Sequence, residues 1–360
     1  MTGNSKGSTV KTMVQQIDIE EYLKSETPLI DVRSPGEYNK GHIPGAINIP
    51  LFSDTERARV GTVYKRQSKE KAMHLGYKYV QPKLEDFILR SKRAAPKGRV
   101  TVYCARGGLR SSSFAEHLEE NGFSHVSVIR GGYKAYRKHA SGTFDIPFHL
   151  KILGGYTGSG KTPVIHQLMK RGYQVIDLEG LAMHRGSAFG AIDEHEQPTS
   201  EQFQNNLFDA WRKLDYCQPV WLEDESHNIG GVVVPYNLIT QMRKSALYFL
   251  DVPKEARARH LVSEYADVSS ESLAESIHKI SKRLGQQNTI RCLHLLEKRN
   301  YYEVAILALS YYDKSYTKAM RYRNRENVFV VPSDSTDPIR NADLIIALSG
   351  QHKVNGAMPA

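Results

Sequence analysis

The segment that most constrains the fold is Gly155-Tyr-Thr-Gly-Ser-Gly-Lys-Thr162, which follows an apolar run at 150–153. It fits the pattern Gly-x4-Gly-Lys-Thr, whose glycines let the backbone wrap around phosphate oxygens. Its lysine reaches the terminal phosphates, and its threonine hydroxyl can hold Mg²⁺. Such a loop joins a strand to a helix, and Pro163 is tolerated in the first turn of that helix. The sequence therefore predicts a phosphate site formed by Gly155, Gly158, Ser159, Gly160, Lys161 and Thr162.

This loop does not reveal which phosphate is bound. ATP is the default ligand, but a diphosphate ester that leaves as pyrophosphate fits the same cradle. The segment 220–226, Val-Trp-Leu-Glu-Asp-Glu-Ser, is similar to a Walker-B strand that ends in acids. We predict that Asp224 acts beside Thr162 in holding Mg²⁺ and that Glu223 lines the substrate pocket. A plain acidic turn explains any single one of these acids equally well.

A second motif, Cys104-Ala-Arg-Gly-Gly-Leu-Arg-Ser111, follows a β-like run at 99–103. Glycines, a following helix N-terminus and two arginines favour a thiolate, so Cys104, Arg106 and Arg110 are the predicted catalytic residues. The spacing Cys-x5-Arg-Ser also occurs in cysteine phosphatases, so it leaves both phosphate transfer and sulfur-group transfer open. Three scattered cysteines cannot form a disulfide framework or a zinc site. Cys217 and Cys292 are expected to be small core residues.

Two segments upstream of Cys104 help to decide between phosphate transfer and sulfur-group transfer. Leu29-Ile-Asp-Val-Arg-Ser-Pro-Gly-Glu-Tyr38 and Gly41-His-Ile-Pro-Gly-Ala-Ile-Asn-Ile-Pro50 resemble the N-terminal signature of rhodanese domains. The resemblance implies a cysteine that carries sulfur or selenium, although a phosphatase branch shares the fold. We interpret Asp31, Arg33 and His42 as structural residues, an ion pair at a strand end and a turn histidine.

The coarse pattern is α/β throughout. It predicts a rhodanese-like parallel-sheet domain at 12–140, a linker at 141–147, and a P-loop NTPase-like doubly wound domain formed by 148–253 and 326–350. The region 254–325 is helical in character, with an apolar face formed by Leu273, Ile277, Ile280 and Leu284. Expected strands lie at 28–32, 46–51, 99–103, 126–129, 150–153, 173–177, 219–222, 246–250, 327–332 and 344–348, and expected helices at 111–120 and 162–171.

The formal net charge is +10, and basic residues cluster with aromatic ones at 133–139, 298–302 and 318–325. Basic side chains neutralise phosphates and tyrosines stack on unpaired bases, which favours a nucleic-acid partner, with RNA the preferred guess. The first residues lack the apolar core of a secretory signal, and no apolar run approaches the length of a membrane span. We therefore expect a cytoplasmic protein with no membrane partner.

Taken whole, the chain resembles the family of bacterial tRNA 2-selenouridine synthases. The resemblance rests on both motifs in this order and on segments 154–162, 177–190, 197–203, 221–230 and 311–316. The family more often has Tyr-Tyr-Asp-Pro where this chain has Tyr311-Tyr-Asp-Lys314, so the role of that segment stays open. Similarity to this family implies a tRNA partner, bound through an anticodon loop that carries 2-thiouridine at the wobble position.

The family resemblance also implies two reactions. The sulfur of 2-thiouridine is first prenylated by geranyl diphosphate, and selenium from selenophosphate then replaces the geranylthio group. The P-loop would hold the diphosphate with Mg²⁺ managed by acids near Asp224. Cys104 would take up selenium as a selenosulfide or attack C2 of the base, while Arg106 and Arg110 hold selenophosphate. Selenophosphate synthetase is a further expected partner.

His184 and Arg185 follow the strand at 173–177 and lie where substrates sit in such folds, so they are candidates for lining the substrate pocket. Phe189 suggests that this pocket has an apolar wall. The first alternative to the synthase is an ATP-dependent tRNA sulfurtransferase or a P-loop kinase with a rhodanese- or phosphatase-like domain. The second is an RNA-binding module without catalysis.

Overall fold

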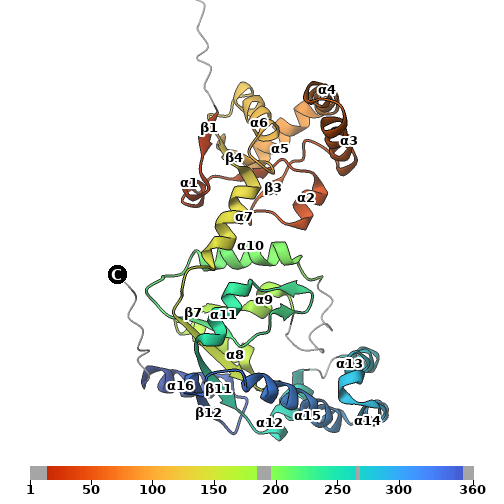
Figure 1. The fold of residues 1–360 in the computed structure, drawn as a ribbon, viewed down its shortest axis with the longest axis vertical. Coiled ribbons are helices and arrows are strands. Elements are labelled where there is room, and N and C mark those ends of the chain that lie inside the picture. The colour runs from red at the N-terminus through yellow and green to blue at the C-terminus, as the bar shows by residue number, and fades with distance from the viewer. Residues whose placement is uncertain (1–13, 185–195, 265–267, 352–360) are drawn as a thin grey trace, which may run out of the picture. The chain divides into compact units, whose positions relative to one another are not determined.

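The computed structural model describes residues 14–184, 196–264 and 268–351 and divides the chain into two compact units, Met1–Thr143 (unit 1) and Phe144–Ala360 (unit 2) (Figure 1). The boundary falls inside the predicted linker at 141–147. Residues 141–147 do not form an unstructured linker, because the first three complete helix α7 (Gly132–Thr143) and Phe144 is buried in unit 2. The Phe144 ring lies 5.5 Å from the ring of Trp211 and meets it edge-on.

Unit 1 contains a five-stranded parallel sheet in the order β1-β5-β4-β2-β3. Its strands are β1 (Gln15–Ile17), β2 (Leu29–Asp31), β3 (Ile47–Asn48), β4 (Arg99–Tyr103) and β5 (His125–Ile129). The strand predicted at 46–51 is only two residues long. Pro50 has no N–H to continue the ladder, although Ile49 and Leu51 still donate backbone hydrogen bonds to Asp31 and Val32.

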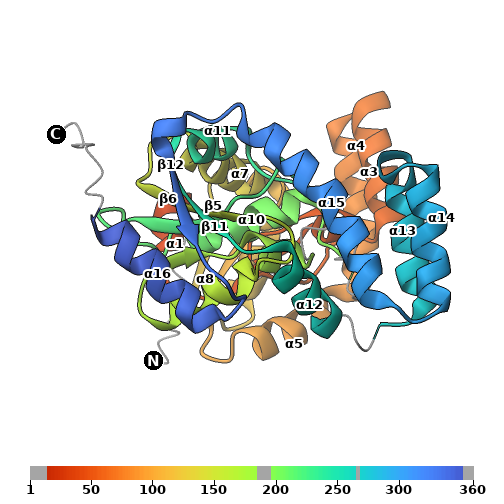
Figure 2. The same cartoon turned by 90° about the horizontal axis from the view of Figure 1, so that it is seen from below.

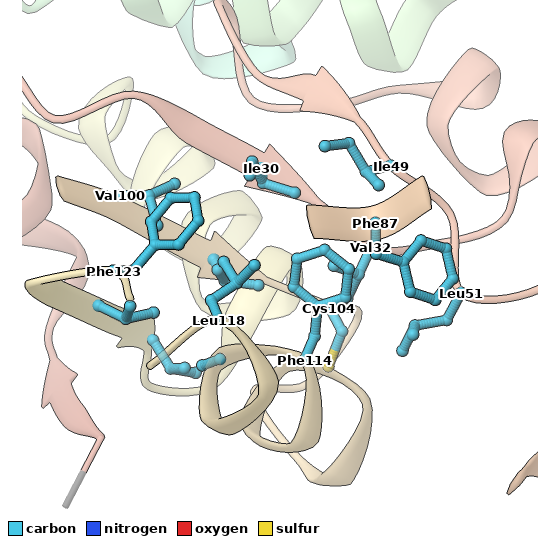
Figure 3. Close-up of a cluster of buried hydrophobic side chains, with 14 of the residues drawn as sticks. Ile30, Val32, Ile49, Leu51, Phe87, Val100, Cys104, Phe114, Leu118 and Phe123 are labelled. Atoms are coloured by element: carbon cyan, nitrogen blue, oxygen red, sulfur yellow. The ribbon is translucent and has the colours of Figure 1, made fainter. Parts of the chain in front are cut away.

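The helices of unit 1 enclose one apolar core (Figure 3). The helix predicted at 111–120 is confirmed as part of α6 (Leu109–Glu120), in which Phe114, Ala115 and Leu118 are buried on one face. Each large side chain that is fully buried contributes roughly 1.5–3 kcal/mol. The remaining helices are α1 (Ile19–Leu23), α2 (Pro35–Lys40), α3 (Asp54–Arg66), α4 (Lys69–Val80) and α5 (Leu84–Ala94), with a short 3-10 turn at Gln81–Lys83.

Unit 2 is built on a second parallel sheet in the order β12-β11-β6-β8-β7. Its strands are β6 (Leu150–Gly155), β7 (Gln174–Ile176), β8 (Val220–Glu223), β11 (Ala246–Asp251) and β12 (Val328–Pro332). The chain winds from central β6 to one edge and later to the other, which confirms the doubly wound α/β prediction. Ligands bind at the carboxyl ends of the strands in such sheets. A two-stranded ribbon, β9 (Asn228–Ile229) with β10 (Val232–Val233), is antiparallel.

The strand predicted at 344–348 is wrong, because these residues belong to helix α16 (Pro338–Gln351). Ala342, Ile345 and Ser349 are buried at helical spacing, and the first two pack against the unit 2 core. A run of five apolar residues is too short to show a period that separates a strand from a helix, which explains the error.

The predicted helical region consists of α12 (Lys254–Glu264), α13 (Ser270–Leu284), α14 (Gln286–Glu297) and α15 (Tyr301–Met320). The four expected apolar residues of α13 are buried against α14 and α15, and Gly285, at φ 88°, ends the helix. Figure 2 shows α13 and α14 beside α15. The other helices of unit 2 are α8 (Lys161–Lys170), α9 (Leu178–Ala182), α10 (Ser200–Trp211) and α11 (Tyr236–Lys244), with a 3-10 turn at Arg325–Asn327.

The two remaining cysteines differ. Cys292 is buried as expected, whereas Cys217 is exposed, so that prediction is wrong. Cys217 lies in a turn between α10 and β8, where its N–H donates to the Asp215 carboxylate at 2.9 Å. Within the described ranges, no helix is long and apolar enough to cross a lipid bilayer.

Candidate functional site

The Cys104 loop connects the end of β4 to the start of α6. The Cys104 side chain is 3% exposed and lies beside Phe114 in the core of unit 1 (Figure 3). Its Sγ is 3.2 Å from the Ser111 hydroxyl. Gly107, at φ 61°, allows the loop to close, because a Cβ there would lie 2.6 Å from the Ile129 carbonyl oxygen. The loop is therefore packed tightly against the end of β5.

The environment of Cys104 favours the thiolate. Burial raises the pKa of the thiol, but the hydrogen bond from Ser111, the charge of Arg110 and backbone hydrogen bonds from Arg106 and Gly108 outweigh it. The net effect is a pKa below the ordinary value. This is the electrostatic setting of a nucleophilic cysteine rather than of a buried structural one.

The two predicted arginines take different positions. Arg110 forms an ion pair of 3.0 Å with Glu37, and Arg57 lies 3.3 Å from the same carboxylate oxygen. Burial raises the pKa of Glu37, but the charge and hydrogen bond of Arg110, with Arg57, bring it down to about 2. Glu37 therefore stays ionised and holds Arg110 at the loop. The Arg106 side chain is exposed.

The interpretation of Asp31, Arg33 and His42 as structural residues agrees with their surroundings. Asp31 and Arg33 form a buried ion pair of 2.6 Å, and Arg33 also donates to the Gly41 carbonyl at 2.7 Å. The His42 ring is stacked on Tyr38 with centroids 3.8 Å apart. These contacts fix the chain between β2 and β3.

In unit 2 the phosphate loop follows β6, and α8 begins at Lys161. The ammonium of Lys161 donates to the Gly155 carbonyl at 3.2 Å, so this side chain lies back over the loop. Gly158 has φ 75°, and a Cβ there would lie 2.9 Å from Leu261 Cγ. The Ser159 hydroxyl is buried and has no hydrogen-bond partner. The predicted loop residues are thus brought together in the conformation that the motif requires.

Three carboxylates meet beside this loop. Glu179 of α9, Glu223 at the end of β8 and Glu225 bring carboxylate oxygens within 4.8 Å of one another. The Thr162 hydroxyl donates to Glu179 at 3.2 Å. Sequence reasoning missed Glu179, although its place just after β7 puts it at the same edge of the sheet as the loop.

Glu223 is the most unusual member of the group. It is fully buried, and neither of its carboxylate oxygens has a hydrogen-bond partner. Burial and the neighbouring charge of Glu179 raise the pKa of Glu223 to about 8. Burial and Glu179 also raise the pKa of Glu225 well above its ordinary value. Such a cluster of carboxylates, with the unpartnered oxygens of Glu223 close to a threonine hydroxyl, has the donor chemistry that Mg²⁺ prefers.

Asp224, predicted to hold Mg²⁺, lies outside this carboxylate cluster. Its Oδ2 accepts a hydrogen bond of 2.6 Å from the Tyr316 hydroxyl, and its Oδ1 accepts one from Arg323. The structure therefore brings Thr162 together with Glu223, whereas Asp224 is held by the end of α15 and the turn after it.

Helix α15 also supports the phosphate loop itself. Arg257, 3% exposed, makes two hydrogen bonds of 2.9 Å to the Asp313 carboxylate and one of 3.0 Å to the Thr157 carbonyl. Asp313 and Tyr316 belong to the segment 311–316, whose role the sequence left open. Asp313 acts on the loop through Arg257, and Tyr316 binds Asp224 at the end of β8, contacts that no local pattern could predict.

Of the remaining candidates, only His184 is described. Its backbone N–H donates to the Glu179 carbonyl at 3.1 Å, and burial lowers the pKa of its ring. His184 thus lies next to the carboxylate cluster. Arg185 and Phe189 fall outside the described residues.

Comparison with known proteins agrees with this two-part arrangement. Residues 10–139 match the rhodanese-like domain, and residues 148–340 match the tRNA 2-selenouridine synthase AAA domain. A tRNA 2-selenouridine synthase of Nitrosomonas europaea is 39% identical over 69% of this chain and 66% of its own length. A tRNA 2-selenouridine synthase of Nitrosomonas eutropha is 36% identical over 81% of this chain and 78% of its own length. A tRNA 2-selenouridine synthase of Shewanella woodyi is 33% identical over 89% of this chain and 95% of its own length.

Proposed function

The chain belongs to the family of tRNA 2-selenouridine synthases, and we propose that it converts 2-thiouridine at the wobble position of tRNA into 2-selenouridine in two steps. The observation that supports this proposal most strongly is that one polypeptide contains an activated thiol, Cys104, and a complete diphosphate-binding loop around Lys161. Prenylation by geranyl diphosphate requires the cradle, and exchange of sulfur for selenium requires the thiol.

The first step takes place at the phosphate loop. The sulfur of 2-thiouridine attacks C1 of geranyl diphosphate, the carbon–oxygen bond breaks, and pyrophosphate leaves. The base loses its N3 proton to solvent as the C2–N3 double bond forms. The loop backbone and Lys161 hold the diphosphate and stabilise the charge that builds up on it.

The same site suits a divalent cation. Thr162, Glu179, Glu223 and Glu225 would hold Mg²⁺, because the unpartnered oxygens of Glu223 are hard donors next to the threonine hydroxyl. When bound, the ion supplies positive charge that makes pyrophosphate a better leaving group. Asp224 contributes by anchoring α15, which in turn supports the loop.

The second step takes place at Cys104. Its thiolate attacks C2 of the geranylated base, the bond from C2 to the geranylated sulfur breaks, and the departing geranylthiolate takes a proton from water. Selenium of selenophosphate then attacks C2 and expels the Cys104 thiolate, and water hydrolyses the selenium–phosphorus bond to release phosphate. Arg110 and Arg106 hold the phosphate of the donor. The alternative in which Cys104 takes selenium as a selenosulfide needs an oxidant, so attack on C2 is the balanced route.

The order of the steps follows from leaving-group chemistry. An alkylated sulfur leaves C2 as a thiol, whereas a free thiocarbonyl sulfur is difficult to displace. The basic and aromatic residues of 254–325 are the proposed tRNA contact in unit 2. Supply of selenophosphate by its synthetase and a cytoplasmic location remain predictions.

Nucleoside mass spectrometry tests the proposal. Purified protein is incubated with 2-thiouridine tRNA and geranyl diphosphate, and selenophosphate is added afterwards. We expect a geranylated nucleoside first and a selenium-containing one after the second addition. Unchanged nucleosides accompanied by ATP consumption would instead support an ATP-dependent tRNA sulfurtransferase or a P-loop kinase.

A further inference from the structure

Helices α3 and α4 form a hairpin at the periphery of unit 1 (Figure 1). No residue of α3 is buried, although the helix is 13 residues long. The hairpin is attached mainly through α4, where Ala72 and Gly76 are buried and Gly76 faces the Phe52 ring closely enough that a Cβ would lie 3.3 Å from it. Val60 of α3 is half-buried and packs against the unit 1 core, and the rest of the helix presents its surface to solvent or to a partner.

The exposed surface of this hairpin is cationic. Residues 54–80 contain seven lysines and arginines but three acidic residues. Two of those acids are already engaged, since Asp54 accepts from the Gly36 N–H at 2.9 Å and Glu56 pairs with Lys83 at 2.6 Å. Within the described ranges, six exposed cations of the hairpin have no ion-pair partner: Arg59, Lys65, Arg66, Lys69, Lys71 and Lys78.

Aromatic side chains lie among these cations. Tyr64 and Tyr77 are each 60% exposed, so their rings are accessible to a stacking partner. On α4, Lys71, His74 and Lys78 are spaced three and four residues apart and share one face, with Tyr77 at its edge. Cations with exposed tyrosines between them match a chain of phosphates that carries unpaired bases.

The start of the hairpin is linked to the Cys104 loop through Glu37 of α2. Asp54, the first residue of α3, is bonded to the backbone of α2, and Arg57 in the next turn shares the Glu37 carboxylate with Arg110. A polyanion that extends along the hairpin to the first turn of α3 would therefore come close to Arg110, which flanks the thiol.

We propose that the α3–α4 hairpin is an RNA-binding surface, which holds the backbone and unpaired bases of tRNA next to the Cys104 loop. The proposal rests on the proposed function for the identity of the RNA. Lysine and arginine neutralise phosphates, while Tyr64 and Tyr77 stack on bases. Charge complementarity favours RNA over an acidic protein, because stacking rings accompany the cations.

The test measures binding of an unmodified tRNA transcript to the full chain by fluorescence anisotropy over a range of salt. One variant carries Lys65→Gln, Arg66→Gln, Lys71→Gln and Lys78→Gln. The matched control carries Lys92→Gln, Arg93→Gln, Lys97→Gln and Arg99→Gln, four exposed cations between the last turn of α5 and the first residue of β4. Cys104 follows the opposite end of that strand. Melting curves of both variants confirm folding.

We expect the hairpin variant to bind at least tenfold more weakly, with a slope of log K against log salt reduced by about 3 for four lost phosphate contacts. The control should stay within about twofold of the unchanged chain. Replacing both tyrosines by alanine should weaken binding while leaving the salt slope unchanged.

Equal affinities and slopes for the hairpin variant and the control would overturn the proposal. So would loss of binding to phosphatidylserine vesicles with unchanged tRNA binding, which would indicate a lipid partner. Because the probe lacks 2-thiouridine and no donor is added, a failure of the proposed reactions would leave this result unaffected.

Discussion

The hydroxyl of Tyr316 donates a hydrogen bond of 2.6 Å to the Asp224 carboxylate and so joins α15 to the acidic end of β8. Burial and the charge of Asp224 raise the pKa of Tyr316 well above 10, so its hydroxyl remains a donor at neutral pH. Arg257 and Asp313 make a second such link, to the phosphate loop. Helix α15 is thus a structural support of the loop, and its role follows from these contacts alone.

Replacing Tyr316 by phenylalanine should destabilise unit 2. In this variant the Asp224 carboxylate loses a charge-assisted hydrogen bond, so we expect the Tm of unit 2 to fall by about 3 to 12 °C. Differential scanning calorimetry measures this. The control is Tyr322→Phe, because Tyr322 is 82% exposed. Equal Tm values for the two variants would show that the Tyr316 hydroxyl stabilises nothing.

Replacing Ser111 by alanine should raise the pKa of Cys104. The hydroxyl lies 3.2 Å from Sγ and stabilises the thiolate, so its loss leaves less thiolate at any given pH near neutrality. The thiolate absorbance near 240 nm, corrected with Cys104→Ala, should titrate with a midpoint at higher pH. Ser112→Ala is the matched control on the same turn. An unchanged midpoint would assign thiolate stabilisation to Arg110 and the backbone instead.

Replacing Glu223 by glutamine should remove the effect of Mg²⁺ on stability. An ion bound only by the folded state, present at ten times its Kd, adds about 1.4 kcal/mol and raises the Tm of the unchanged chain. Glutamine keeps the volume but supplies a weaker ligand, so that rise should largely disappear. Glu255→Gln, on the exposed surface of α12, should retain it. A full Mg²⁺ response in Glu223→Gln would place the cation elsewhere.

Replacing Lys161 by alanine should impair prenylation before selenation. Removing a preorganised charge at the leaving diphosphate should lower kcat for prenylation by about 10²–10³. The same variant given tRNA that is already geranylated should still incorporate selenium. Lys170→Ala, at the exposed end of α8, controls for lost positive charge. Equal loss of both steps in Lys161→Ala would indicate one shared active site.

Local signals in the sequence were enough to predict both loops. The glycines, cysteine, lysine and threonine act through backbone conformation and nearest neighbours, which the order of residues records directly. The same holds for the strand at 99–103, which the structure reproduces residue for residue, and for the apolar face of α13.

What the sequence missed depends on tertiary contacts. Glu179 joins Glu223 because two parallel strands end at one edge, and Tyr316 reaches Asp224 from 92 residues away. The helix at 344–348 was mistaken for a strand because its short apolar run shows no distinctive period, and Cys217 was mistaken for a core residue because tertiary contacts, rather than residue type, decide its exposure.

The most direct measurement is the nucleoside content of 2-thiouridine tRNA incubated with Cys104→Ala, geranyl diphosphate and selenophosphate together. The thiol is needed only for the exchange of sulfur for selenium, so we predict that the geranylated nucleoside accumulates and that selenium is absent. Selenouridine formed at the unchanged rate would contradict the role of Cys104. Absence of both products would contradict the assignment of the two steps to two separate loops.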